Sequence, residues 1–253
     1  MIEVKHLSKR FGKTQVLSDI SAVFEKGRIN QVIGKSGSGK SVLCKCIVGL
    51  FVPEEGEVLY DGRPFHHLDK EQKREVRQEI GMLFQSSALF DSLTVLENVL
   101  FPLRMFATME ESEMEDRAQL CLKRVNIEGK DKLYPSEISG GMQKRVGIAR
   151  AIAMNPKYLF VDEPNSGLDP QTSIVIDNLI NELTEEYDMT TIMITHDMNS
   201  VMEAGDNILF IHEGKAWWQG TRQQMLDSDN RELNDFIFAS GLMRKVKEAA
   251  KRG

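Results

Sequence analysis

Residues 34–41 read GKSGSGKS, which matches the phosphate-binding spacing G-x-x-x-x-G-K-S/T at every fixed position. Glycines in such a loop let backbone N–H groups approach phosphate oxygens where a side chain would clash. Lys40 can then reach the β- and γ-phosphates of a nucleotide, and the Ser41 hydroxyl can ligate Mg²⁺. A flexible Ser/Gly loop is the alternative, but the apolar strand before the motif and the helix after it favour phosphate binding. The predicted contacts are Gly34, Lys35, Ser36, Gly37, Ser38, Gly39, Lys40 and Ser41.

A pair of carboxylates follows a short apolar run further along the chain. Residues 158–161 read YLFV, and Asp162 and Glu163 come directly after them. Beside a phosphate loop, the end of such a strand places Asp162 where it can hold Mg²⁺, directly or through water. Glu163 would then be positioned to polarise an attacking water as a general base. Taken alone, the pair is equally compatible with an ordinary acidic loop.

A third motif, ISGGMQKR at 138–145, places small residues directly before a helical segment. A helix N-terminus with exposed N–H groups is a second potential anion site. Two polar residues end apolar runs elsewhere: Gln85 follows IGMLF, and His196 follows TTIMIT. Taken alone, His196 is best explained as a polar residue at the end of a strand.

These motifs need strands and helices in a definite order to position them. Alternating or apolar runs predict strands at 2–8, 16–24, 28–33, 80–84, 158–161 and 190–195, with a hairpin around the Glu-Gly turn at 213–214. Helices are predicted after the phosphate loop, at 69–78 and over most of 92–155, where Thr108 and Glu111 predict a capping box. Continuous apolar strands alternating with helices indicate an α/β core with a parallel sheet and an inserted helical subdomain.

Composition places the chain among globular proteins and limits what it can bind. It has 253 residues, with 41% hydrophobic and 28% charged side chains, and a formal net charge of -6. A net negative charge argues against a surface that grips nucleic acid, so we expect no nucleic-acid partner. The longest uncharged stretch, 80–90, is too short for a bilayer span, which needs roughly 20 apolar residues. Three cysteines, an odd and sparse set, fit a reducing cytosol.

Five motifs occur in the order GKSGSGKS, Gln85, ISGGM, YLFVDEP and His196. Because of these motifs and their order, residues 1–225 resemble the ATP-binding subunit of an ABC transporter. The resemblance implies an α/β P-loop NTPase fold. Such a fold has a RecA-like core, an antiparallel β subdomain and an inserted helical subdomain, here at about 88–155. It also implies an ATPase that uses ATP and Mg²⁺.

Roles follow from the resemblance at the matching positions. Phe11 lies where such ATPases stack an aromatic ring on adenine, and Val16 would pack beside it. Gln85 would sense Mg²⁺ and the attacking water, and His196 would contact the γ-phosphate. The implied catalytic residues are Glu163, His196, Gln85 and Lys40, and the implied Mg²⁺ ligands are Ser41, Gln85 and Asp162.

The chain carries one phosphate loop and one signature segment, which has a consequence for assembly. In the ABC family, the signature of one copy completes the ATP site of the other. The resemblance therefore implies a head-to-tail dimer of two copies around two ATP molecules. In it Ser139, Gly140 and Gly141 would act on the partner's nucleotide, and the segment 166–169 resembles the loop that communicates across the dimer.

The signature departs from its commonest form, because Met142 stands where most members of the family have glutamine. Together with the stretch 82–103, it resembles the ATPases of MCE-associated, Mla-type phospholipid transporters. That resemblance implies phospholipid transport between bacterial membranes through an integral membrane permease, with an MCE-domain lipid-binding subunit in the complex. Permease contact is expected near Ala88, Leu89, Phe90 and Leu93, with simple packing of the helical subdomain as the alternative for each.

Two other functions stay open at this point. One is the ATPase of a different ABC importer or exporter, serving amino acids, metals or lipoproteins. The other is a soluble ABC ATPase without a permease, such as one that serves cofactor assembly. A DNA-maintenance ATPase would need long coiled-coil insertions, and the sequence shows no heptad run.

Residues 226–253 follow the ATP-binding domain as an extension that we expect to be helical. An apolar face could be formed there by Phe236, Ile237, Leu242, Met243 and Val246. The resemblance implies that this extension docks on the second copy, and a solvated helix is the alternative. The whole chain is expected to lie at the cytoplasmic face of the inner membrane as a peripheral subunit.

Overall fold

A computed structural model describes residues 1–239 of the chain. The chain divides into two compact units. The first unit comprises Met1–Leu68 together with the chain from Met193 onward, and the second comprises Asp69–Ile192. Each unit carries part of the predicted chemistry.

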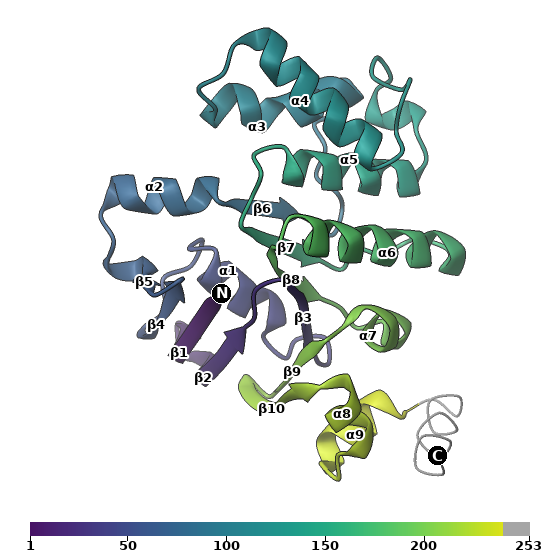
Figure 1. Cartoon of the computed structure of the whole chain (residues 1–253). Helices are drawn as coiled ribbons and strands as arrows, with labels where there is room; N and C mark the ends of the chain where they lie inside the picture. Colours follow the sequence, from purple (N-terminus) through teal and green to yellow (C-terminus); the bar gives the residue numbers. More distant parts are fainter. Residues whose placement is uncertain (240–253) are drawn as a thin grey trace. The chain divides into compact units, whose positions relative to one another are not determined.

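The first unit contains a four-stranded antiparallel sheet with the order β2-β1-β4-β5 (Figure 1). Its long strands are β1 (Ile2–Phe11) and β2 (Thr14–Phe24), which run further than the predicted 2–8 and 16–24. The other two strands are β4 (Glu55–Tyr60) and β5 (Arg63–Pro64). Alternating side chains of β1 and β2, among them Val4, Ile20 and Phe24, form a buried face.

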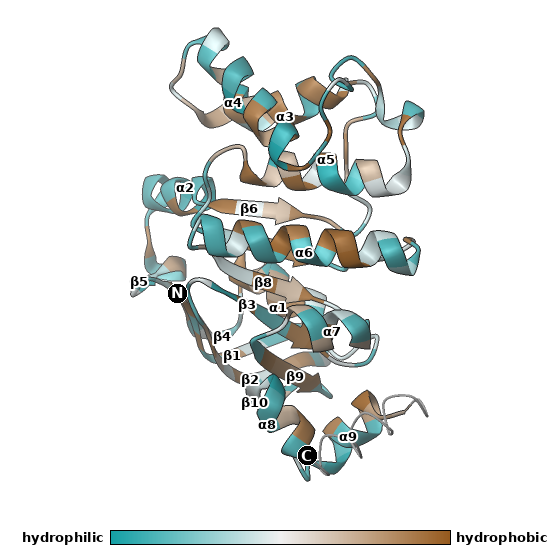
Figure 2. Ribbon diagram, turned by 45° about the vertical axis from the view of Figure 1, so that its right-hand side comes forward, coloured by the Kyte–Doolittle hydropathy of each residue, from teal (hydrophilic) through white to brown (hydrophobic). Residues whose placement is uncertain are grey.

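Three further strands of the first unit form a mixed arrangement. Strand β3 covers Arg28–Ile33 as predicted and pairs in parallel with β9 (Asn207–His212), which pairs antiparallel with β10 (Lys215–Thr221). Figure 2 shows β9 as a largely hydrophobic strand, in keeping with its buried Ile208 to Ile211. The helices of this unit are α1 (Lys40–Ile47), η1 (Phe65–His67), α7 (Met198–Ala204), α8 (Arg222–Asp227) and α9 (Arg231–Ile237).

Helices α8 and α9 pack into the core of the first unit. Leu226, Leu233 and Ile237 belong to one buried cluster with Ile208 and Phe210 of β9. Phe236 stacks on Phe210 with a ring-centroid distance of 5.4 Å. Two members of the predicted apolar face, Phe236 and Ile237, are thus occupied within their own chain; Leu242, Met243 and Val246 lie outside the described residues.

The second unit contains the strands β6 (Ile80–Leu83), β7 (Tyr158–Asp162) and β8, which spans Thr190–Ile194 and crosses the boundary between the units. Strand β6 pairs with β7 in parallel, and β7 lies between β6 and β8 in the sheet. These strands are largely apolar, apart from Asp162 in β7 and Thr190 and Thr191 in β8, as expected when helices cover both faces of a sheet. The helices are α2 (Lys70–Gln78), α3 (Val95–Phe106), α4 (Glu111–Arg124), η2 (Pro135–Glu137), α5 (Gly140–Ile152) and α6 (Pro170–Glu186).

Side-chain caps set where the helices of the second unit begin. Asp69 caps α2 in a full capping box with Gln72, and Thr94 caps α3 in one with Glu97. The capping box predicted from Thr108 and Glu111 is wrong, because α4 begins at Glu111 with Glu110 as its N-cap and Glu113 as the reciprocal partner. The N-cap is the residue at which the backbone leaves the helical conformation. That residue is Glu110, and Thr108 lies two residues too early to take the position.

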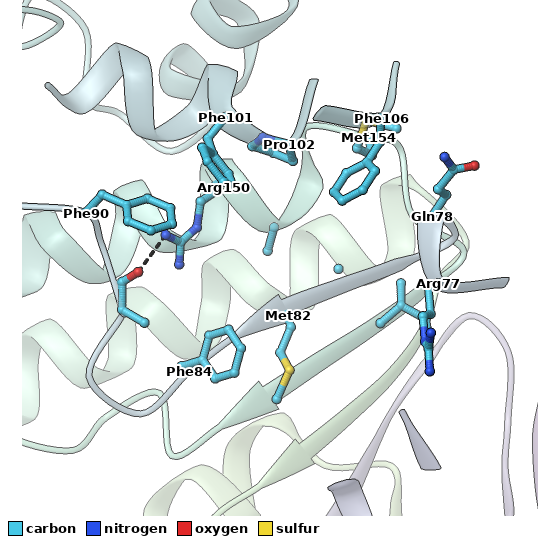
Figure 3. Close-up of a pocket in the computed structure, with 14 residues that line it drawn as sticks. Arg77, Gln78, Met82, Phe84, Phe90, Phe101, Pro102, Phe106, Arg150 and Met154 are labelled. Carbon is cyan, nitrogen blue, oxygen red and sulfur yellow. Dashed lines mark hydrogen bonds between the residues drawn. The ribbon is translucent and has the colours of Figure 1, made fainter. Parts of the chain in front are cut away.

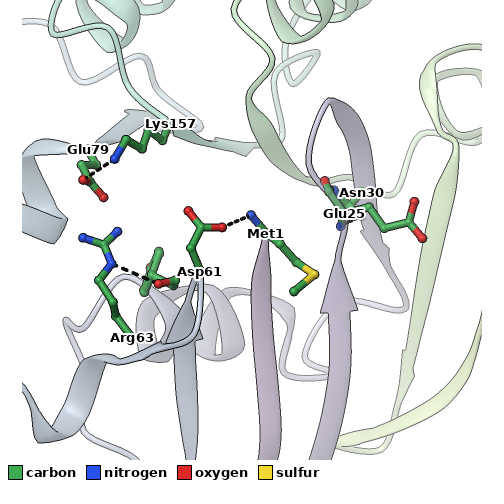
Figure 4. A network of polar contacts seen from close by, with 8 residues as sticks. Met1, Glu25, Asn30, Asp61, Arg63, Glu79 and Lys157 are labelled. Carbon is green, nitrogen blue, oxygen red and sulfur yellow. Dashed lines mark hydrogen bonds and ion pairs between the residues drawn. The ribbon is translucent and has the colours of Figure 1, made fainter.

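Polar contacts join neighbouring segments within each unit (Figure 4). In the first unit the N-terminal ammonium of Met1 donates to Asp61 at 2.6 Å, and the guanidinium of Arg63 donates to the carbonyl of Tyr60 at 3.1 Å. In the second unit Lys157 forms an ion pair of 2.8 Å with Glu79. Among the described residues, no helix is both long enough and apolar enough to span a bilayer.

The helices and the antiparallel and mixed sheets together make the chain an α/β protein.

Candidate functional site

The predicted phosphate loop connects β3 to α1 in the first unit. Helix α1 begins at Lys40 with Gly39 as its N-cap, and it has neither a capping side chain nor an acidic residue in its first turn. Its first N–H groups and the positive end of its dipole are thus available to an anion. The Lys40 side chain is buried, and its ammonium donates to the carbonyls of Gly34 at 2.7 Å and Lys35 at 3.0 Å.

The loop has the form of a cradle for phosphate oxygens. Gly37 has φ +78, a backbone conformation that is strained for any residue with a Cβ. A Cβ at this position would meet no atom within 4 Å, so glycine is required by the backbone conformation and not by lack of space. Ser38 has a buried hydroxyl that makes no hydrogen bond, although buried hydroxyls normally do. The loop therefore fits a nucleotide phosphate.

Four predicted residues of the first unit differ in their exposure. Phe11, at the end of β1, is 44% exposed, and its ring meets that of Phe51 edge-on at a centroid distance of 5.3 Å. The Lys9 ammonium lies over the Phe11 ring, 5.2 Å from its centroid, and the exposed part of the ring is accessible to a ligand. Val16 is half-buried in β2, and His196 is exposed in the loop between β8 and α7. Ser41, in the first turn of α1, is exposed.

In the second unit, Gln85 and Glu163 contact each other directly. Gln85 Nε2 donates to Glu163 Oε2 at 2.9 Å and to Ser166 Oγ at 3.4 Å. Glu163 follows the last residue of β7, Asp162, and has φ +46, a left-handed conformation that costs a residue with a side chain about 1–3 kcal/mol. Such strain persists only where neighbouring groups hold it, and it turns the Glu163 carboxylate toward Gln85.

Lys144 of α5 lies against the same pair from the buried side. It is 4% exposed, and its ammonium donates to the carbonyl oxygen of Gln85 and, at 3.4 Å, to that of Glu163. Burial lowers the pKa of Lys144, and the charges of Asp162 and Glu163 oppose that shift. The sequence analysis did not single out this lysine.

The signature segment forms the N-terminus of α5. Ser139 is the N-cap, and its hydroxyl accepts a hydrogen bond from the N–H of Met142 at 3.3 Å. A Cβ at Gly141 would come within 2.7 Å of Thr172 Cγ2, so this glycine lets α5 approach the start of α6 closely. Ser139 and Gly140 are exposed, which leaves them accessible to a ligand from outside the chain.

No group of three or more His, Cys, Asp or Glu side chains gathers into a metal site within residues 1–239. The candidate Mg²⁺ ligands Ser41, Gln85 and Asp162 are a hydroxyl, an amide and a carboxylate. This oxygen-donor set suits a hard cation that takes its other ligands from phosphate and water. The residues present thus fit Mg²⁺ bound together with a nucleotide.

An apolar pocket of about 470 Å³ lies in the second unit (Figure 3). Ala88 and Phe90, two of the four residues predicted to contact a permease, line it, whereas Leu89 and Leu93 are half-buried and do not. The sequence analysis missed most of its other walls: Met82 and Phe84 from the β6 segment, Phe101 and Phe106 from α3, and Met154.

One face of the pocket is built from aromatic rings. Phe90 and Phe101 have ring centroids 4.6 Å apart, and both rings are more than one-third exposed. Arg150 of α5 reaches into this region and donates to the carbonyls of Ser87 at 2.6 Å and Ala88 at 2.7 Å. Exposed aromatic side chains around an apolar hollow are suited to receive an apolar segment of another protein.

Known proteins resemble this chain in sequence over most of its length. Residues 17–166 match the family profile described as ABC transporter. The "Intermembrane phospholipid transport system ATP-binding protein MlaF" of Haemophilus influenzae is 37% identical over 94% of this chain and 90% of its own length. The "Probable ribonucleotide transport ATP-binding protein mkl" of Mycobacterium leprae is 36% identical over 93% of this chain and 68% of its own length. The "Methionine import ATP-binding protein MetN" of Desulfitobacterium hafniense is 43% identical over 87% of this chain and 66% of its own length.

Solved structures agree with this grouping. The ATP-binding cassette MJ0796, in a dimeric post-hydrolysis state bound to ADP and Pi, has a TM-score of 0.78 and 34% identity, covering 87% of this chain and 98% of its own. The structure of cbiO1 from Clostridium perfringens, part of the ABC transporter complex cbiONQ, has a TM-score of 0.83 and 28% identity, covering 99% of this chain and 98% of its own.

Proposed function

The chain belongs to the ABC transporter family and is an ATPase domain that hydrolyses ATP, and from this premise we propose that it drives phospholipid transport between bacterial membranes through a partner permease. The observation that carries the lipid assignment is Met142 in the signature segment, together with the likeness to a phospholipid-transport ATPase over 90% of that protein's length. The same proposal places the chain at the cytoplasmic face of the inner membrane.

The first unit would bind the nucleotide. The cradle of Gly34, Lys35, Ser36, Gly37, Ser38 and Gly39 would donate backbone N–H groups to phosphate oxygens. The Lys40 ammonium would leave its backbone carbonyl acceptors and bind the β- and γ-phosphates. Phe11 and Val16 would hold the adenine. His196 would contact the γ-phosphate. These contacts position the nucleotide and neutralise its charge, which are the main sources of catalysis in phosphoryl transfer.

The second unit would supply the hydrolytic groups. Glu163 would take a proton from the attacking water, and Gln85, already bonded to its carboxylate, would orient that water. The candidate ligands for Mg²⁺ are Gln85 and Asp162 of this unit and Ser41 of the first unit, and the ion would neutralise charge on the phosphates. The strained backbone at Glu163 supports this assignment, since such conformations concentrate at functional sites.

Two copies would work together. The solved relative MJ0796 is dimeric, and ABC cassettes form homodimers. For this chain we place Ser139, Gly140 and Gly141 against the nucleotide of the second copy in a head-to-tail arrangement. The exposure of Ser139 and Gly140 at the N-terminus of α5 supports that placement.

The permease would dock in the apolar pocket, and an MCE-domain protein would complete the lipid pathway. Exposed Phe90 and Phe101 beside Ala88 support a protein contact at this place. ATP binding would close the dimer and hydrolysis would open it, and the pocket would pass that motion to the membrane subunit.

A second candidate substrate has a specific observation in its favour. The chain is 43% identical to a methionine import ATPase, a higher identity than to the phospholipid-transport relative, although over less of the chain. Methionine import through a permease is therefore the alternative. Both candidates share the ATPase chemistry and differ in what the permease carries.

The partners of the chain decide between these candidates. The tagged chain would be isolated from its native membrane in mild detergent, and its bound proteins and lipids identified by mass spectrometry. We expect a permease, an MCE-domain protein and phospholipid. A permease with a soluble solute receptor and no MCE-domain protein would reject lipid transport in favour of import, and the absence of any membrane protein would reject both.

A further inference from the structure

Lys144 is the point where the signature helix α5 touches both segments that carry the proposed hydrolytic pair. Its ammonium bonds to the backbone carbonyl of Gln85 and lies 3.4 Å from that of Glu163. Because both acceptors are backbone atoms, the lysine fixes the course of the chain itself at these two points. The two side chains are thereby brought to the separation at which Gln85 bonds to the Glu163 carboxylate.

The same helix holds the next residues of the Gln85 segment. Arg150 donates to the carbonyls of Ser87 and Ala88, and both of these residues have a left-handed backbone, with φ of 60° and 45°. Carbonyls at 85, 87 and 88 thus all accept hydrogen bonds from cations of α5. The position of α5 therefore sets the path of the segment that joins Gln85 to the pocket.

Packing alone does not explain a charge at position 144. A buried ammonium loses its hydration, and neutral carbonyls restore only part of it. An unbranched apolar side chain would fill the same space without that cost. What the ammonium adds is a pair of directional bonds to two separate chain segments.

We infer that Lys144 is a positioning residue that transmits movement of α5 to the contact between Gln85 and Glu163. This inference rests on the proposed function. The N-terminus of α5 carries Ser139 and Gly140, which in the proposed dimer meet the nucleotide of the second copy. Lys144 then links the arrival of that nucleotide to the alignment of the hydrolytic pair in its own chain.

Two substitutions separate this role from a merely structural one. Lys144→Met keeps an unbranched side chain that is one atom shorter and removes both hydrogen bonds, whereas Lys144→Arg keeps the charge and the donors. In the membrane complex that contains the full chain, we expect Lys144→Met to lower kcat for ATP by about tenfold or more, because small misplacements of catalytic groups are costly. KM for ATP should stay within about twofold, and Lys144→Arg should recover most of the loss. The matched control is Lys157→Met, which removes an exposed lysine of the same unit.

Each outcome bears on the inference. An unchanged kcat in Lys144→Met overturns it, and so does a loss of kcat that is accompanied by an equal rise in KM and is not recovered by Lys144→Arg. Glu163→Gln is measured in parallel. Near-normal turnover of Glu163→Gln refutes the proposed general base, whereas slow turnover of Glu163→Gln beside normal turnover of Lys144→Met refutes only the role of Lys144.

Discussion

Gln85 and Glu163, 78 residues apart in the sequence, are joined by a hydrogen bond of 2.9 Å from the amide nitrogen of Gln85 to the carboxylate of Glu163. The bond orients the amide of Gln85, whose oxygen then points away from the carboxylate. In the proposed mechanism, both groups orient the attacking water.

Replacement of Glu163 by glutamine tests this arrangement. Glu163→Gln keeps the size of the side chain and an oxygen that can accept from Gln85, but it removes the basic carboxylate. We expect kcat for ATP hydrolysis to fall by about 10²–10⁴-fold with nucleotide binding retained, measured by phosphate release and by binding of a fluorescent ATP analogue. Glu185→Gln, an exposed glutamate on α6, is the control and should hydrolyse at the wild-type rate.

Strands were predictable where the signal is local. The strand 28–33 is found at the predicted residues, and β7 begins at the predicted residue and runs one residue further than predicted, to Asp162, because an apolar run followed by charge marks a strand end. The bond between Gln85 and Glu163, and the reach of Lys144 to both backbones, depend on how distant segments pack. A lysine within a helix carries no sequence signal that its ammonium will be buried.

The pocket shows the same limit. The resemblance singles out Ala88 and Phe90 as permease contacts, and both line the pocket. Phe101 and Phe106 come from a different element, α3, and their part in the pocket depends on the packing of that helix. At α4 the N-cap is Glu110 and not Thr108. Residue preferences alone do not determine at which residue the backbone enters the helix.

Mixing two inactive variants tests the head-to-tail dimer. Lys40→Ala removes the phosphate-binding ammonium, and Gly140→Asp places a negative charge in the signature, where a Cβ has space. Each homodimer should be inactive. A heterodimer would hold one site with an intact phosphate loop and an intact signature, so an equal mixture should regain about a quarter of wild-type ATPase activity if pairing is random and the sites are independent. A mixture that stays as inactive as its components would contradict the arrangement in trans.

The N-cap of α6 gives a prediction for pH. Hydrogen bonds from the hydroxyl and N–H of Thr172 and from the N–H of Gln171 hold the pKa of Asp169 below its usual value. A carboxyl group with a lowered folded-state pKa contributes stability above its unfolded pKa of about 4, and that contribution is lost as the pH falls through the folded value. The difference in Tm between the wild type and Asp169→Ala should therefore be constant from about pH 7 to 5 and shrink below about pH 4.

Thermal unfolding followed by circular dichroism measures this difference. Asp169→Asn keeps an oxygen that accepts from the helix N–H groups but carries no charge, so its Tm should lie between the other two at neutral pH. Its separation from Asp169→Ala should not depend on pH. A gap between the wild type and Asp169→Ala that persists undiminished to pH 3 would show that the charge of Asp169 plays no part in the cap.

Phe101 offers the sharpest test of the apolar pocket as the permease site. Its ring packs against Phe90 and is 36% exposed, so Phe101→Ala opens one wall of the pocket without removing a fully buried side chain. Aromatic residues at the centre of a protein contact carry a large share of the binding energy, and recovery of the permease with the tagged chain should fall by about tenfold or more.

The hydrolytic groups do not line the pocket, so the basal ATPase activity of Phe101→Ala without the permease should remain within about twofold of wild type. Leu120→Ala is the matched control, because Leu120 is an exposed apolar residue of α4 that does not line the pocket. Loss of the permease in Phe101→Ala alone would connect the pocket to transport. Equal recovery of the permease with both variants would instead place the permease contact elsewhere on the chain, since a wall that contributes to binding cannot be removed without weakening the complex.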